Sequence, residues 1–215
     1  MKIAIDASRA FVSKRTGTEN YSYQLIRAIA KIDRKNNYLL YTRGYSDVSS
    51  ERGYGKNFTF KPINFSRLWT QIGLAKEVFL NPPDVLFIPA HTLPLIRPLG
   101  LKTVVTIHDL GYEYLPQYHQ FPQKLYLNKS TEFAALQATH LIAVSQATKK
   151  DLINKLNCPE EKITVIYEGF DKAKFKIENL KLIENLKLKI DNYLLFVGTL
   201  QPRKNIERLI EAFSL

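Results

Sequence analysis

Thr103-Val104-Val105-Thr106-Ile107-His108 is a short, largely apolar run that ends on a histidine. Residues 84–89, Asp-Val-Leu-Phe-Ile-Pro, form a second run of the same kind. Neither run alternates between apolar and polar residues, as a strand with one solvated face does, so both are expected to be buried on two sides. Strands of this kind are typical of parallel sheets that helices cover on both faces.

Segments with helical periodicity alternate with apolar strands along most of the chain. Strands are expected at residues 2–7, 38–42, 58–63, 84–89, 103–108, 141–144, 163–167 and 193–197. Helices are expected at residues 18–32, 68–80, 122–138, 146–156 and 205–213, with Thr18 and Ser145 as N-caps. The alternation predicts the α/β class, with a doubly wound, Rossmann-like parallel sheet.

Ligands of such sheets bind at the carboxyl ends of the strands. The residues at or directly after five of these strand ends are Asp6–Arg9, Pro89–His91, His108–Asp109, Ser145 and Glu168–Gly169. We therefore expect all of them to face one crevice. A histidine at its rim can donate to a sugar or phosphate oxygen, or move protons near neutral pH. Position alone leaves open the alternative that His108 only caps a neighbouring loop.

The loop over residues 8–18 joins the first strand to the first helix, where dinucleotide enzymes carry a glycine fingerprint. The pattern G-x-G-x-x-G is absent, which argues against a nicotinamide cofactor. Gly17 and Thr18 could still let a backbone N–H approach a phosphate, with Arg9, Lys14 and Arg15 nearby. A plain turn at the start of the helix is the alternative interpretation.

The 215 residues include 31 Lys and Arg against 20 Asp and Glu, a net charge of +11. This excess favours an anionic partner: nucleic acid, an anionic membrane surface or a phosphorylated substrate. A lysine-rich solvated surface is an equally good explanation. No helix-turn-helix, zinc or aromatic sheet motif supports specific nucleic-acid binding, so none is expected.

The single cysteine, Cys158, excludes an internal disulfide and is typical of a reducing cytoplasm. No run approaches the roughly 18 apolar residues of a membrane span, and the amino terminus lacks a signal-peptide pattern. The four histidines lack the close spacing of a zinc helix, and no P-loop is present. We expect neither a metal nor a cofactor, and a cytoplasmic location.

Residues 196–206, Phe-Val-Gly-Thr-Leu-Gln-Pro-Arg-Lys-Asn-Ile, indicate a strand, a turn and the basic start of a helix. Backbone N–H groups at such a turn, with Arg203 and Lys204 beside them, are suited to a diphosphate. The sequence stops one helix later. The expected organisation is an N-terminal domain over residues 1–170, a linker over 171–191, and the first strand and helix of a truncated second domain over 192–215.

Five stretches together resemble the GT-B glycosyltransferases of family 4. They are Arg15–Tyr21, with the glycine at the start of a helix; Thr106–Leu110, with the histidine; Ala143–Leu152, the serine-capped helix; Val165–Asp171; and Val197–Asn205, the most specific. The bacterial mannosyltransferase-like members that build O-antigen and capsule are the most similar. The resemblance extends along essentially the whole chain.

The resemblance implies an enzyme of two Rossmann-like domains, a retaining glycosyltransferase that needs no metal. The first domain would hold a growing or lipid-linked glycan acceptor, with Arg9, His91 and Asp109 in the acceptor cleft. The second would hold a nucleotide-sugar, GDP-mannose being favoured. If the family's residue roles hold at the matching positions, His108 would be the catalytic residue that binds the transferred sugar. Gly17, Thr18, Arg203 and Lys204 would contact the donor.

The sequence departs from the family pattern in two respects. Glu168 stands where the family usually has Asn. The family's acidic pair, Glu-x7-Glu, belongs to the second domain, and we interpret the same spacing of Glu160 and Glu168 as accidental. The 215-residue chain alone is therefore expected to be inactive. Its C-terminal end is expected to expose apolar side chains and could mediate self-association; these are Leu194, Phe196, Leu209, Ile210 and Phe213.

A different class of function stays open beside the enzyme. A Rossmann-like domain could bind glycan or phosphate without transferring a sugar. Under the enzyme hypothesis, the basic surface would bring the protein to the inner face of the cell membrane, where lipid-linked glycans of surface polysaccharides are extended.

Overall fold

The computed structural model describes residues 1–44, 53–65, 67–110, 123–170, 194–198, 200 and 202–214, with backbone only for 123–127 and 203. These residues form two compact units, Met1–Glu168 and Gly169–Leu215. Within the described ranges, no helix is both long and apolar enough to cross a membrane.

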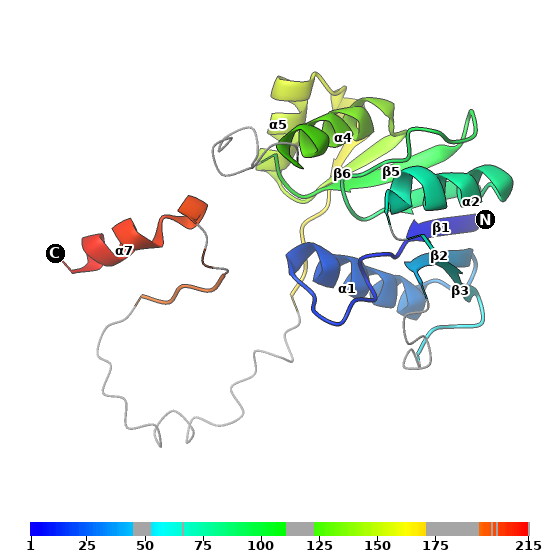
Figure 1. Cartoon of the computed structure of the whole chain (residues 1–215), viewed down its shortest axis with the longest axis horizontal. Coiled ribbons are helices and arrows are strands. Elements are labelled where there is room, and N and C mark those ends of the chain that lie inside the picture. Colours follow the sequence, from blue (N-terminus) through cyan, green and yellow to red (C-terminus); the bar gives the residue numbers. More distant parts are fainter. Residues whose placement is uncertain are drawn as a thin grey trace, which may run out of the picture. The chain divides into compact units, whose positions relative to one another are not determined.

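Met1–Glu168 is built on a seven-stranded, all-parallel sheet in the order β3-β2-β1-β4-β5-β6-β7 (Figure 1). The strands are β1 (Lys2–Asp6), β2 (Asn37–Arg43), β3 (Phe58–Ile63), β4 (Val85–Ile88), β5 (Lys102–Ile107), β6 (His140–Ala143) and β7 (Ile163–Val165). The order reverses between β1 and β4, which is the point where doubly wound sheets open a crevice. The predicted fold class is confirmed.

Helices connect the strands and cover both faces of the sheet. They are α1 (Gly17–Ile32), the π-helical turn η2 (Trp69–Leu74) continuing into α2 (Ala75–Leu80), α4 (Gln123–Gln137) and α5 (Gln146–Leu156). In Figure 1, α1 lies on one face, and α2, α4 and α5 lie on the other. Two separate hydrophobic cores result, one containing Ile26 and Ala30 of α1, the other Val78, Ala134 and Leu152.

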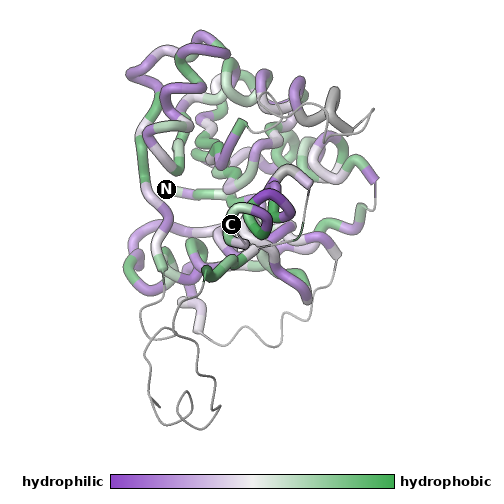
Figure 2. The backbone as a smooth tube through the Cα atoms, turned by 90° about the vertical axis from the view of Figure 1, so that its left-hand side faces the viewer, coloured by the Kyte–Doolittle hydropathy of each residue, from purple (hydrophilic) through white to green (hydrophobic). Residues whose placement is uncertain are grey.

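The interior strand β5 shows why the sheet needs helices on both faces. Thr103, Val105, Thr106 and Ile107 are each at most 1% exposed, so adjacent residues, which point to opposite faces, are equally buried. The helices, by contrast, alternate between hydrophilic and hydrophobic residues along their length (Figure 2). Each helix thus turns one side to the sheet and the other to water.

The N-terminal boundaries of two helices depend on their capping residues. The N-cap of the first helix lies two residues earlier than expected: it is Thr16, not Thr18. The Glu19 carboxylate accepts a hydrogen bond from the Thr16 backbone N–H at 3.1 Å, and the Thr16 side chain accepts one from the Glu19 backbone N–H, which together form a capping box. The Thr16 hydroxyl also donates to the Glu19 carboxylate. For α5 the predicted cap is confirmed, since Ser145 Oγ accepts the Thr148 N–H at 3.0 Å.

Gly169–Leu215 is described in short pieces: residues 194–198, a 3-10 turn over Pro202–Lys204 and the helix α7 (Ile206–Phe213). The strand predicted at 193–197 is not formed over 194–197. A strand needs a neighbour for its backbone hydrogen bonds, and the described part of this unit supplies none. The expected exposure of apolar side chains is confirmed for Leu194, Phe196, Leu209, Ile210 and Phe213.

Candidate active site

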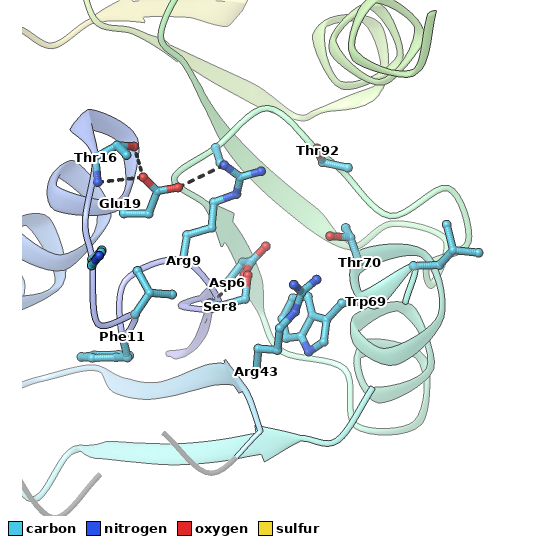
Figure 3. Close-up of a pocket in the computed structure, with 14 residues that line it drawn as sticks. Asp6, Ser8, Arg9, Phe11, Thr16, Glu19, Arg43, Trp69, Thr70 and Thr92 are labelled. Carbon is cyan, nitrogen blue, oxygen red and sulfur yellow. Dashed lines mark hydrogen bonds and ion pairs between the residues drawn. The ribbon is translucent and has the colours of Figure 1, made fainter. Parts of the chain in front are cut away.

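A pocket of about 710 Å³ opens at the carboxyl edge of the sheet (Figure 3). Four chain segments build it: the β1–α1 loop, the end of β2, the start of η2 and the loop after β4. Its polar lining includes Asp6, Ser8, Arg9, Lys14, Thr16, Glu19, Arg43, Thr70 and Thr92. Because parallel strands end at the same edge, residues distant in sequence meet here, as expected of a doubly wound sheet.

Asp6 is a buried carboxylate in this pocket. Burial raises the pKa of the Asp6 carboxyl, although hydrogen bonding to Ser8 and the positive charges of Arg9 and Arg43 oppose the rise. The Ser8 backbone N–H donates to Asp6 Oδ1 at 3.0 Å. A carboxylate held this way, with cations nearby, can accept a hydrogen bond from a ligand hydroxyl.

Three cationic side chains line the same pocket: Arg9, Lys14 and Arg43. Arg9 Nη1 lies 3.4 Å from Glu19 Oε1, and Figure 3 shows this pair above the pocket. The cations and Asp6 suit a ligand that carries hydroxyls together with a negative charge.

His108 is held by hydrogen bonds at both of its ring nitrogens. Its Nε2 donates to the Pro89 carbonyl at 3.0 Å, and its Nδ1 lies 3.0 Å from Glu168 Oε1. The Tyr21 ring meets the His108 ring edge-on, with 4.7 Å between centroids. These contacts fix the ring, which joins the ends of β4, β5 and β7.

His91 lies against the same ring, with 5.6 Å between the His91 and His108 centroids. Its Nδ1 is buried and, within the described part of the chain, has no hydrogen-bond partner. Burial lowers the pKa of His91 to about 4, helped by the charges of His108 and Arg9, while the negative charge of Asp109 opposes the shift. His91 is therefore neutral near pH 7 and has an unused polar atom.

The N-terminus of α5 supports the segment that follows β5. Thr148 Oγ1 donates to the His108 carbonyl at 3.2 Å and lies 2.9 Å from Ser145 Oγ. The predicted serine cap thereby also fixes the backbone of the histidine.

The structure brings together several of the predicted site residues. His91, His108 and Glu168 are in contact, and Asp109 is close enough to influence His91 electrostatically. Gly17 lies one helical turn before Tyr21 on α1, next to Thr18, so the helix start faces the histidine cluster. A Cβ at Gly17 would meet nothing within 4 Å, so the space in front of it is open.

The other predicted contacts belong to the second unit. Lys204 lies in the turn before α7, with its side chain exposed, and only the backbone of Arg203 is described. Each unit is a body of its own, so these two residues are not placed against the pocket.

Sequence reasoning missed two participants and one contact. Glu168 was expected to face the crevice because it follows a strand end, but its contact with His108 was not predicted. Arg43 ends β2 and could have been found by the same strand-end rule. Tyr21 lies inside a helix, where no local signal distinguishes a residue that faces a site from one that faces the core. Within the described ranges, no group of three or more His, Cys, Asp or Glu side chains could hold a metal ion.

Comparison with known families identifies the class of protein that this fold and site define. The profile of Glycosyltransferase Family 4 matches residues 15–174, which is most of the chain. The chain therefore belongs to Glycosyltransferase Family 4, and the resemblance inferred from its motifs is confirmed.

Individual relatives are bacterial polysaccharide enzymes. The O-antigen chain mannosyltransferase RfbU of Salmonella typhimurium is 31% identical over 121 residues, covering 56% of this chain and 30% of that protein. The O-antigen chain mannosyltransferase B of Escherichia coli is 27% identical over 117 residues (53% and 31%). The capsular polysaccharide biosynthesis glycosyltransferase CapM of Staphylococcus aureus is 32% identical over 118 residues (52% and 30%). The chain thus spans about a third of the length of the curated relatives it matches.

Because the pKa of His91 is lowered on folding, the free energy of unfolding should depend on pH between about 6.5 and 4. The unfolded side chain binds a proton near pH 6.5, whereas the folded one does so only near pH 4. The free energy of unfolding should therefore fall as the pH drops from about 6.5 to 4, by at most ~1.4 kcal/mol per pH unit. Urea unfolding at intervals across this window, for the wild type and H91N, measures the slope. H91N should show a shallower slope, and identical slopes would contradict the assignment.

Proposed function

We propose that this chain is the acceptor-side part of a retaining glycosyltransferase. The enzyme would move a hexose, with mannose favoured, from a nucleotide-sugar such as GDP-mannose to a growing or lipid-linked glycan of a surface polysaccharide. Family membership and the relatives' activities support this proposal. The observation that carries it is the doubly hydrogen-bonded His108 beside the start of α1, at the carboxyl edge of the sheet.

His108 would hold a hydroxyl oxygen of the transferred sugar. Its bond to the Pro89 carbonyl fixes the ring, while Glu168, whose side chain is 49% exposed, is the partner that a sugar oxygen can replace or share. Such a donor can contribute in two ways. It can position the reacting sugar, and it can stabilise the charge that develops in the transition state.

The departing diphosphate would lie against the start of α1. Gly17 and Thr18 open this helix, where N–H groups lack intrahelical partners and the helix dipole favours negative charge. Arg203 and Lys204 of the second unit would add two positive charges. In this proposal backbone dipoles and cations stabilise the leaving group.

The acceptor would occupy the pocket of about 710 Å³. Arg9, His91 and Asp109 are the proposed contacts of the acceptor. Asp6 and Arg43 are added to them because both line this pocket together with Arg9. Hydroxyl-rich, anionic acceptors such as phosphate-linked glycans match this mixture of carboxylates and cations.

A transfer assay tests the proposal. The 215-residue chain, and a form of the protein that also carries a donor-binding domain, are incubated with labelled GDP-mannose and lipid-linked acceptor extracted from the source cells. We expect transfer by a form that carries a donor-binding domain and none by the 215-residue chain alone. Glycan binding without transfer in every form would favour a noncatalytic binding module instead.

Removal of the His108 side chain should abolish most of the activity. H108A loses a fixed donor to the transferred sugar, so kcat should fall about 10²–10³-fold, the usual cost of one lost transition-state donor. H140A is the matched control, because His140 begins β6 at the opposite edge and bonds Thr164 there, 2.8 Å away. Near-normal turnover by H108A, or an equal loss in H140A, would refute the assignment.

A substitution at Gly17 tests whether this position is needed for ligand binding or for folding. G17A introduces a methyl group into open space at the start of α1, so stability should stay constant or rise by up to about 1 kcal/mol. Transfer should fall at least about tenfold, because the methyl group would obstruct the diphosphate. Turnover and urea unfolding are measured side by side.

Glu168 should act only through His108. E168Q should lower kcat about tenfold, and adding it to H108A should cause no further loss, since residues of one hydrogen-bonded unit are non-additive. The control is E160Q, because Glu160 has the same exposed carboxylate but pairs with Lys149 at 2.9 Å. Additive losses in the double variant would show that Glu168 acts independently of the histidine.

A further inference from the structure

Glu168 places a carboxylate beside the ring that is proposed to hold the transferred sugar. Its Oε1 lies 3.0 Å from His108 Nδ1, and its side chain is 49% exposed. In the described part of the chain, His108 is its only ion-pair partner, so no lysine or arginine there neutralises the carboxylate at close range. A half-exposed glutamate carries a negative charge near neutral pH. Glu168 therefore presents a charged group that only accepts hydrogen bonds to whatever lies against His108.

The charge of Glu168 reaches its surroundings and is reinforced by a second acid. Burial raises the pKa of Tyr21, and the negative charge of Glu168 adds to this rise. Asp109 follows His108 directly in the sequence, and its negative charge acts on His91. Two acids from the ends of different strands thus surround the same ring.

Positive side chains gather instead in the pocket that the acceptor would occupy. Arg9, Lys14 and Arg43 all line it. The charge of Arg9 also reaches His91, but Glu19, 3.4 Å from the Arg9 guanidinium, partly offsets it. The carboxyl edge of the sheet therefore separates its charges, with three cations in the pocket and two acids beside the ring.

The hydrogen-bonding groups at the ring favour a ligand hydroxyl. The Pro89 carbonyl already takes the Nε2 proton of His108, at 3.0 Å. A ligand can approach from the Nδ1 side, because Glu168 on that side is half exposed. A hydroxyl can donate to a carboxylate oxygen of Glu168 and still accept a hydrogen bond, whereas a ligand carboxylate can only accept. Charge and hydrogen bonding thus both oppose a carboxylate at this place.

We infer that Glu168 is a specificity-determining residue that selects a neutral hexose over a uronic acid as the transferred sugar. The inference rests on the proposed function, in which that sugar lies against His108. The two sugars differ at one carbon, which carries a hydroxyl in the hexose and belongs to a carboxylate in the uronic acid. Repulsion between this carboxylate and Glu168 disfavours the wrong sugar. Because water screens part of the repulsion at a half-exposed side chain, the expected discrimination is about tenfold.

A purely structural role for Glu168 gives a different expectation. If its carboxylate only holds the His108 ring in place, removal of the charge should weaken the binding of both sugars to the same extent. If the carboxylate selects the sugar, its removal should change the ratio of the two affinities. The ratio therefore separates the two roles.

Calorimetric titration with a matched pair of donors tests the inference. GDP-mannose and GDP-mannuronic acid are titrated into a form of the protein that also carries a donor-binding domain. The wild type should bind GDP-mannuronic acid about tenfold more weakly than GDP-mannose, and E168Q should reduce this difference to about threefold or less. E168D keeps the negative charge and should keep most of the preference. E160Q should keep all of it, because Glu160 pairs with Lys149 at 2.9 Å.

The outcomes distinguish this inference from the proposed function. Equal affinities of the wild type for the two donors, an unchanged ratio in E168Q, or the same change of ratio in E160Q would overturn the inference and leave the proposed function standing. Binding of neither donor by the wild type would overturn the proposed function, and this inference with it. Thermal unfolding confirms that each variant folds.

Discussion

Burial of both faces of the parallel sheet is the constraint on which the rest of this structure depends. A strand such as β5, with adjacent residues equally buried, has no face left for polar chemistry. Charged and reactive side chains therefore gather where the strands end, and parallel strands end together at one edge. Asp6, His91, His108 and Glu168 meet there for that reason. The same constraint requires helices on both faces, so the first residues of α1 and α5 are brought to the same edge.

His108 shows how contacts at the carboxyl edge of the sheet hold a side chain in a fixed position. The ring is held between a backbone carbonyl of the β4 end and a carboxylate of the β7 end, with Tyr21 against its side. His91, of the same residue type and in contact with it, is kept neutral by burial. Two histidines from neighbouring strand ends thus have different surroundings: the His108 ring is hydrogen-bonded at both nitrogens, whereas His91 has a buried Nδ1 without a partner among the described residues.

Sequence by itself determined the order and type of nearly all elements in Met1–Glu168, since apolar runs and helical periodicity are local signals. It also placed His91 and His108 at the carboxyl edge of the sheet and indicated the family. It was wrong about the cap of α1 and about a strand at 194–197, which has no neighbouring strand to pair with. The tertiary structure alone decided that Glu168 reaches His108 across 60 residues, that burial lowers the pKa of His91, and that the leucines of residues 94–99 face outward. These facts depend on distances between segments remote in sequence and on how much water each side chain retains, and no local pattern encodes either.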